Sequence, residues 1–285
     1  MSNSKQVYKI NALLIETNFH GVDELMKFYD FASKFTFTSI ELDLTSVNLI
    51  DANLAALIMA LAHKLKHQYK NYIFIQIPPH MNVFFRNGLV SHLQGKGNED
   101  TYEDNRQSTI PLKAFDKEDD DKYCHYLKKE FLGHRGLDNL SRTVKDNLQS
   151  HFSEVFTNVA LHANPILPIY SCGQYFPEKN LLKFTLIDLG NGFLEKIKLK
   201  TNGNINNDNS AMIWATQNLN STKDSNFGPG GLGLKELKKY CENNNGSFHI
   251  CSGSGYVNMI GNKTLEHNLK IPLQGSLINL IFRNI

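Results

Sequence analysis

The sequence predicts an α/β protein of two domains, and three observations support that fold class. Segments with strand-like and helix-like hydrophobic periodicity alternate over the first ~95 residues and again from residue 138 onward. The chain of 285 residues is long enough for two domains of ordinary size. Hydrophobic residues make up 41% and charged residues 20%, as in a packed globular protein.

In the first expected domain, residues 1–95, strand and helix patterns follow one another regularly. The expected strands are 7–15, 39–44 and 72–77, and the expected helices are 22–34, 52–66 and 81–93. Asp51 is a candidate N-cap for the helix at 52–66, because a short acidic side chain can accept a hydrogen bond from a free N–H of the first turn. This order predicts a sheet covered by helices.

Residues 96–137 are expected to be a linker and connecting segment. The stretch 95–107 is polar and contains glycine, which favours a loop. A short strand is expected at 108–115, followed by a charged run at 117–122 and a helix at 123–132.

The second expected domain comprises residues 138–285. Its expected helices are 141–163, 211–218 and 232–243, and its expected strands are 181–188, 248–251, 256–260 and 277–282. The asparagine-rich stretch 199–209 is expected to be a loop, and Asn245 with Gly246 ends the last helix.

Composition and the chain ends exclude several classes of protein. The net charge of +2 provides no large field of one sign, which disfavours nucleic acid or a membrane surface as the main partner. None of the four cysteines lies in a Cys-x-x-Cys pair, which disfavours zinc knuckles and thioredoxin-like chemistry. The N-terminus lacks the apolar core of a secretion signal, and the longest apolar stretch is too short to cross a bilayer. We therefore expect a cytoplasmic protein.

A carboxylate, an amide and an imidazole recur at four-residue spacing in the expected helix 141–163. They are Glu154, Asn158 and His162, and this spacing places them on one helix face beside an apolar stripe. An amide oxygen is a suitable ligand for Mg²⁺, and a nearby carboxylate can deprotonate a nucleophile that attacks a phosphate. The alternative is an ordinary solvated polar flank.

Asp188 follows an apolar run and therefore lies at the C-terminal end of an expected strand, where ligands commonly bind in α/β layers. Its carboxylate can accept a hydrogen bond from the amino group of adenine. Gly190 and Gly192, which lack a Cβ, would let the backbone approach such a base closely. The alternative is an ordinary Asp/Gly turn.

A glycine-rich stretch leads directly into the expected helix 232–243. Its residues are Gly228, Gly230, Gly231, Leu232 and Gly233. Free N–H groups at a helix N-terminus attract phosphate, although a glycine-rich surface loop is the alternative interpretation. Lys223 could neutralise phosphate charge or be an ordinary surface lysine, and the hydroxyl of Ser276 could reach adenine or a bound water.

These motifs, in this order and spacing, resemble the GHKL ATPase superfamily. Residues 154–162 are similar to its N box, 188–192 to its first glycine box, 228–234 to its second glycine box and 275–276 to its terminal Gly-Thr element. The resemblance implies a Bergerat-fold α/β sandwich that binds ATP and Mg²⁺. It also implies that Glu154 is the catalytic acid, Asn158 the Mg²⁺ ligand and Asp188 the adenine contact.

Within the superfamily, residues 154–162 look most like the anti-sigma-factor serine kinases, among which homodimers are common. A histidine kinase is disfavoured, because neither His125 nor His134 is followed by the acid and proline of a phosphoacceptor box. Families that carry a further domain after the ATPase are disfavoured as well, because this chain ends just after the last expected strand.

The first domain resembles a STAS domain, a module that binds partner proteins. The resemblance lies in residues 40–44 followed by residues 49–57. Phosphorylatable members carry Ser or Thr just after the acid at the head of this helix, whereas this chain has Ala52 and Asn53 after Asp51. The domain is therefore expected to bind a protein partner without being phosphorylated by its own kinase module.

The resulting expectation is an ATP- and Mg²⁺-dependent signalling protein that hydrolyses ATP or phosphorylates Ser or Thr. The alternative is a binding module that uses ATP as a conformational ligand without turnover. A scaffold that has lost nucleotide binding is a weaker third possibility, because Asp188 and Asn158 are intact. His63 and His67, four residues apart, could bind a metal, but no acid completes a site and a solvated helix face is favoured.

Overall fold

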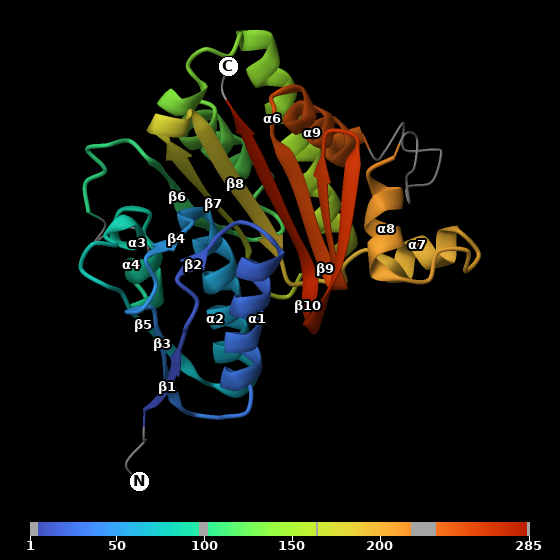
Figure 1. The fold of residues 1–285 in the computed structure, drawn as a ribbon. Helices are drawn as coiled ribbons and strands as arrows, with labels where there is room; N and C mark the ends of the chain where they lie inside the picture. Colours follow the sequence, from blue (N-terminus) through green and yellow to red (C-terminus); the bar gives the residue numbers. More distant parts are fainter. Residues whose placement is uncertain (1–4, 97–101, 164, 218–231, 284–285) are drawn as a thin grey trace.

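A computed structural model describes residues 5–96, 102–163, 165–217 and 232–283 and shows a mixed α/β protein (Figure 1). A three-stranded parallel sheet lies in the N-terminal part, and a five-stranded antiparallel sheet forms the centre of the remainder. Among the described helices, none combines the length and the apolar character needed to cross a bilayer.

The N-terminal sheet has the order β1-β3-β5, and its helices pack on one of its faces. Its strands are β1 (Gln6–Lys9), β3 (Ser39–Asp43) and β5 (Tyr72–Gln76), and its main helices are α1 (Phe19–Ala32) and α2 (Ala55–Tyr69). Burial alternates along β3, where Ile40 and Leu42 face the helices. This part therefore has the helical cover that the order of strands and helices predicts, and its strands are parallel.

Two of the expected N-terminal elements are wrong in extent. The strand expected at 7–15 is divided into β1 and a separate β2 (Leu14–Ile15), which pairs with β4 (Leu49–Ile50). The helix expected at 81–93 is divided into α3 (Val83–Arg86) and α4 (Leu89–Leu93), because Gly88 has a φ of 89° that ends one helix before the next begins.

The five-stranded sheet has the order β6-β7-β8-β10-β9, with every neighbouring pair antiparallel. Its strands are β6 (Thr109–Phe115), β7 (Ile169–Phe176), β8 (Leu181–Asp188), β9 (Ser247–Ile260) and β10 (Lys263–Arg283). Strand β7 was not expected, because Ser171, Gly173 and Gln174 interrupt its apolar pattern. The expected strands 248–251 and 256–260 are parts of the single long strand β9.

The segment expected to connect the domains contributes to this second sheet. Strand β6 pairs with β7 at one edge of it, and α5 (Asp120–Tyr126) continues as the π-helical turn η2 (Leu127–Phe131). Buried aromatic and leucine side chains of this segment belong to the same hydrophobic cluster as the sheet. The segment therefore contains the strand expected at 108–115 and, beginning a few residues earlier than expected, the helix expected at 123–132.

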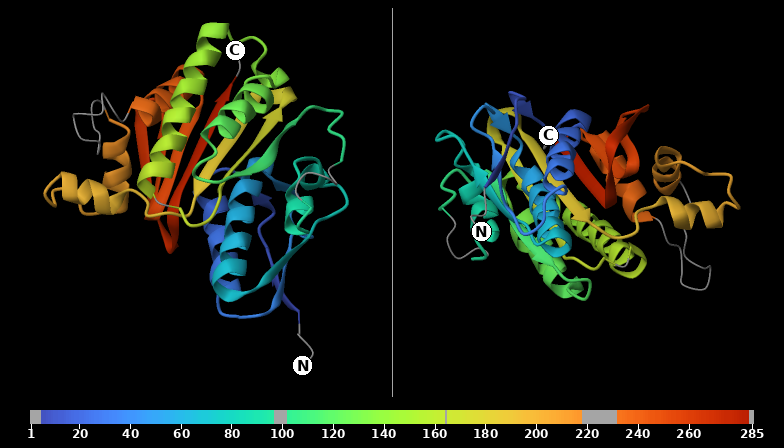
Figure 2. Two further views of the ribbon diagram at one scale, coloured as in Figure 1. Left: turned by 180° about the vertical axis from the view of Figure 1, so that it is seen from behind. Right: turned by 90° about the horizontal axis from the view of Figure 1, so that it is seen from below.

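The two faces of the five-stranded sheet are covered by different parts of the chain (Figures 1 and 2). The helices α6 (Arg142–Asn158) and α9 (Leu232–Asn243) cover one face together with α5, and they share a hydrophobic cluster with it. The N-terminal part covers the other face and shares a second cluster with it. Helix α7 (Leu194–Lys200), which was not expected, and helix α8 (Asp208–Ala215) follow β8. The residues between the two helices form the main part of the loop expected at 199–209.

Candidate functional site

Asp188 is the last residue of β8, and its side chain is buried, with 1% exposure. Phe184 and Leu186 lie four and two residues before Asp188 and therefore share its face of the strand. Both belong to the cluster under α6 and α9, so Asp188 lies on the helix-covered face of the sheet. Ser276, its neighbour on β10, donates a hydrogen bond to one carboxylate oxygen, and the backbone N–H of Gly190 donates to the other at 2.8 Å.

The pKa of Asp188 is raised to about 6, because burial raises it by more than the hydrogen bonds from Ser276 and Gly190 lower it. The charged carboxylate therefore carries an uncompensated desolvation cost. A ligand amino group that donates a hydrogen bond to it would reduce that cost. The arrangement is suited to selecting a ligand by a donor group.

The loop after β8 approaches the end of helix α6 so closely that a side chain would not fit. A Cβ at Gly190 would lie 2.2 Å from the carbonyl oxygen of Ala163. The N–H of Asn191 donates to the same carbonyl oxygen at 2.9 Å. Gly192 has a φ of 68°, a conformation that glycine adopts without strain. These contacts join the segments 188–192 and 154–163, which the sequence analysis selected separately.

Helix α6 begins at the N-cap Ser141, whose side chain accepts a hydrogen bond from the N–H of Val144. Glu154 and Asn158 are half-buried on the flank of its apolar stripe, as expected. His162 lies beyond the α-helical part, in the π-helical turn η4 (Val159–Ala163). Because a π-helical turn is wider than an α-helical one, the single-face register expected for all three residues does not continue unchanged to His162.

Helix α9 packs on α6 at the position of the glycine-rich motif. A Cβ at Gly233 would lie 2.9 Å from the carbonyl oxygen of His151 and 3.3 Å from the Cβ of Glu154. Leu232 is the first residue of α9. Lys223, Gly228, Gly230 and Gly231 lie outside the described residues.

The side-chain oxygen of Asn158 is the feature of this region that is relevant to metal binding. Its Oδ1 is buried and has no hydrogen-bond partner among the described residues. No group of three or more His, Cys, Asp or Glu that could hold a metal occurs in the described part of the chain. Mg²⁺ is commonly held by one or two protein oxygens together with substrate phosphates, so an amide oxygen without a partner fits a cation shared with a ligand.

A hollow of about 420 Å³ opens beside the loop after β8. Gly190, Asn191 and Gly275 line it, together with residues of β9 and of the segment before Gly275. Asp188, Glu154 and Asn158 are not among its lining residues. The hollow is therefore adjacent to the place where the motif segments meet and does not coincide with it.

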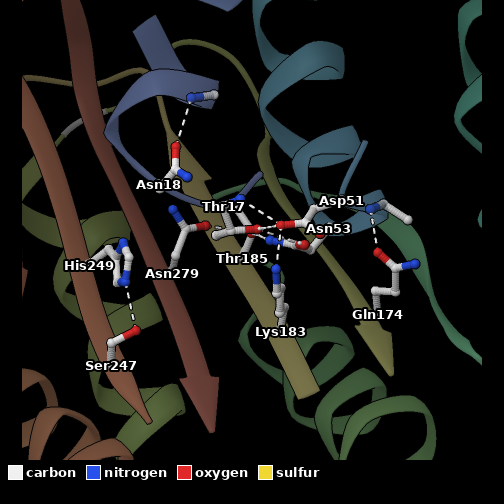
Figure 3. A network of polar contacts seen from close by, with 12 residues as sticks. Thr17, Asn18, Asp51, Asn53, Gln174, Lys183, Thr185, Ser247, His249 and Asn279 are labelled. Carbon is white, nitrogen blue, oxygen red and sulfur yellow. Dashed lines mark hydrogen bonds and ion pairs between the residues drawn. The ribbon is translucent and has the colours of Figure 1, made fainter. Parts of the chain in front are cut away.

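A second polar cluster, which the sequence analysis did not predict, lies on the opposite face of the sheet (Figure 3). The buried Asp51 carboxylate receives Lys183 Nζ at 2.6 Å and the N–H and hydroxyl of Thr17 at 2.6 and 2.8 Å. Asn53 Nδ2 donates to Thr185 Oγ1 at 2.8 Å, and Thr185 donates to Asn279 at 2.6 Å. This cluster joins the head of the α2 region to strands β8 and β10.

Asp51 does not act as the side-chain N-cap that the sequence analysis predicted. It precedes the short 3₁₀ turn η1 (Ala52–Leu54), which leads into α2, and its side chain makes no capping hydrogen bond. The ion pair with Lys183 and the bonds from Thr17 occupy the carboxylate instead. In the sequence, the sign of this polar cluster is that Lys183 and Thr185 occupy alternate positions of an otherwise apolar expected strand.

Ala52 and Asn53 are fully buried at this contact. The N–H of Ala52 donates to Gln174 Oε1 on β7 at 2.6 Å, and its carbonyl accepts a hydrogen bond from Asn87 at 3.0 Å. Both residues are thus enclosed against the five-stranded sheet. They are inaccessible to a kinase in this arrangement.

Comparison with known proteins adds no family assignment. No protein-family model matches this chain, and no curated protein sequence matches it.

Proposed function

We propose that this protein binds ATP and Mg²⁺ through a GHKL-type ATPase domain in residues 138–285 and acts in signalling, as the anti-sigma-factor serine kinases do. The observation that carries the proposal is the buried Asp188 carboxylate at the end of β8, on the face that α6 and α9 cover. Its carboxylate can select a ligand by accepting a hydrogen bond. Segment 188–192 packs against Ala163, and Gly233 packs against His151 and Glu154 in the same helical region.

Each described residue has a defined role in this proposal. Asp188 accepts a hydrogen bond from the adenine amino group, with Ser276 and Gly190 holding its carboxylate in place. Asn158 Oδ1 supplies a ligand to the Mg²⁺ ion that neutralises the phosphates. The N-terminus of α9, at Leu232 and Gly233, offers backbone N–H groups to phosphate oxygens.

Glu154 is the proposed general base. It takes the proton of a serine, threonine or water hydroxyl as that oxygen bonds to the γ-phosphorus. The bond between the γ-phosphorus and the β–γ bridging oxygen breaks, and ADP leaves. His162, Lys223, Gly228, Gly230 and Gly231 are proposed to complete the nucleotide contacts, as the resemblance implies.

We propose further that the first domain is a STAS-like module with a protein partner. The parallel strands with helices on one face, and the acid Asp51 before α2, support that proposal. The absence of a hydroxyl at Ala52 and Asn53 and the burial of both residues argue that the module is not switched by phosphorylation at this site.

Calorimetric titration with a non-hydrolysable ATP analogue tests the binding step. Wild-type protein should bind in the presence of Mg²⁺, Asp188→Asn should lose at least about tenfold in affinity, and Asn158→Ala should lose the Mg²⁺ dependence. Asp30→Asn, on the distant helix α1, is the matched control and should bind as wild type does. Equal binding by Asp188→Asn and wild type would refute the proposed site.

The alternative function is a nucleotide-operated switch without turnover, which the same contacts support equally well. The two are separated by steady-state phosphate release. If the protein is an ATPase or kinase, Glu154→Gln should abolish release and retain nucleotide affinity. If wild-type protein binds nucleotide and releases no phosphate with any hydroxyl acceptor, the switch is the correct function.

A further inference from the structure

Two adjoining hollows lie on the N-terminal part, between α2, β5 and α4. The larger has a volume of about 460 Å³ and the smaller about 280 Å³. They share His63, Lys66 and Tyr72 as lining residues, so together they form one groove along the outer flank of α2. We call this pair of hollows the α2 groove.

The lysine and histidine side chains that line the α2 groove are not balanced by acidic ones within the part of the chain that the structure describes. The larger hollow adds His92, and the smaller adds His67 and Lys70, while no Asp or Glu is found among the described residues that line either one. Lys66 Nζ lies 5.7 Å from the centre of the Tyr72 ring, over an exposed aromatic surface. The groove therefore presents positive charge and hydrogen-bonding imidazoles to solvent.

The two imidazoles at the ends of the larger hollow are held by hydrogen bonds on one ring nitrogen. His63 Nδ1 is bonded to the hydroxyl of Tyr170 on β7, and His92 Nδ1 is bonded to the carbonyl oxygen of Gly88 at 2.8 Å. His63 is thus not the solvated helix residue that its spacing indicated. Met59, Ile73 and Leu93 supply apolar side chains to the lining of the larger hollow.

The groove runs beside β5, which is an edge strand of the three-stranded sheet. β5 pairs with β3 on one side, and no described strand pairs with it on the other. Tyr72 N–H donates to Thr38 on the β3 side, and Leu44 N–H donates to Gln76 O, so the alternate residues Ile73 and Ile75 direct their backbone groups outward. Tyr72 and Phe74 are 58% and 51% exposed, so two large side chains of this strand are accessible to a partner.

We propose that the α2 groove binds an extended acidic segment of a partner protein, which adds to the sheet as a strand next to β5. Its backbone bonds to Ile73 and Ile75, one row of its side chains packs on Met59 and Leu93, and its carboxylates lie near Lys66 and Lys70. The charge of the lining selects an acidic peptide, since a basic one would be repelled by every ionised group of the groove. This proposal is independent of the proposed nucleotide site.

Fluorescence anisotropy with a labelled peptide of alternating Glu and Val tests the proposal on the full chain. Wild type should bind it, and the double variant Lys66→Glu with Lys70→Glu should bind at least about tenfold more weakly. Lys198→Glu with Lys200→Glu reverses two exposed lysines on α7 and should leave the affinity unchanged. Absence of binding to wild type, or an equal loss in the α7 control, would overturn the proposal.

A second experiment tests whether the peptide adds to the sheet as a strand. The same peptide carrying N-methyl groups at alternate backbone positions keeps its charges but cannot complete a ladder, so it should lose most of its affinity. Hydrogen exchange at the amides of Ile73 and Ile75 should become slower when the unmodified peptide is bound. Equal affinity of the two peptides, or unchanged exchange at both amides, would show that only charge attraction is involved and would overturn the strand model.

Discussion

The face of the five-stranded sheet that meets α6 and α9 is apolar up to Asp188, whereas the face that meets the N-terminal part carries a buried polar network. In β8, Leu182, Phe184 and Leu186 belong to the helix-covered cluster. The alternating residues Lys183 and Thr185 bond instead to Asp51 and Asn53, more than 130 positions earlier in the chain. One strand thus serves two interfaces of different chemistry.

The difference between the two faces shows what determines how each face is covered. Apolar packing is not directional, so any helix with an apolar face of suitable shape can cover the first face. A buried ion pair and buried amides are costly unless each finds its partner, so the second face accepts the N-terminal part in one orientation. We infer that the polar network fixes how the two parts of the chain are docked.

The largest expected effect comes from the apolar face. Phe184→Ala should lower the free energy of unfolding by about 5 kcal/mol, because the buried ring packs on Phe131 and Phe152 at 4.4 and 5.2 Å and would leave a large cavity. Leu199→Ala, at a side chain that is 77% exposed, is the control and should change it little. Urea unfolding measures both, and equal effects would contradict this account of the face.

A somewhat smaller loss of stability is expected when the ion pair on the polar face is removed. Lys183→Met should cost about 3 kcal/mol, because it leaves the Asp51 carboxylate buried without its cation. Lys179→Met, at an exposed position four residues earlier, should have almost no effect. Adding Asp51→Leu to Lys183→Met should restore part of the loss in urea unfolding. A double variant less stable than the sum of both single changes would show that the ion pair is not the coupling element.

The smallest expected change in the free energy of unfolding comes from Asp188, the acidic residue on the otherwise apolar face of β8. Its pKa in the folded protein is about 6, above the ordinary value of 3.8, so the folded state binds this proton more tightly than the unfolded state does. The associated stability is fully present below pH ~4 and is lost as pH rises through ~6. Asp188→Asn should therefore gain about 2 kcal/mol relative to wild type between pH 4 and pH 7.

Urea unfolding of both proteins across this pH range measures that gain. The ordinary surface change Asp30→Asn should show no comparable trend, because Asp30 is on an exposed part of α1. If the difference between Asp188→Asn and wild type does not depend on pH, the carboxyl is not destabilised by burial in the way described here.

The sequence predicted several elements from their own hydrophobic patterns, including β8 with its polar residues Lys183 and Thr185, and it missed strand β7. The α6 and α9 helices and strand β8 were expected from their own patterns. Strand β7 was missed because its Gln174 and Ser171 break the pattern, and Gln174 is bonded to Ala52 on the other part of the chain. Local periodicity contains no information on such partners.

The candidate nucleotide site was likewise predicted in part from the sequence, and other parts of it were found only in the structure. The order of the three motifs came from the sequence, and so did the prediction that Glu154, Asn158 and Asp188 belong to one site. The structure adds that Gly190 abuts Ala163 and that Gly233 abuts Glu154, which the spacing along the chain does not determine. It also shows the π-helical turn at η4, which changes the register after Asn158 and could not be read from four-residue spacing.

By itself, the sequence determined an α/β chain and the positions of its main helices, because each of these depends on neighbours within one element. It also supplied the motifs from which nucleotide binding is proposed. Tertiary structure alone decided that the head of the α2 region is enclosed by the five-stranded sheet, that Asp51 pairs with Lys183, and that β5 remains an edge beside a basic groove. The reason is physical: these features are made by side chains and backbone groups far apart in the chain, and only packing brings them into contact.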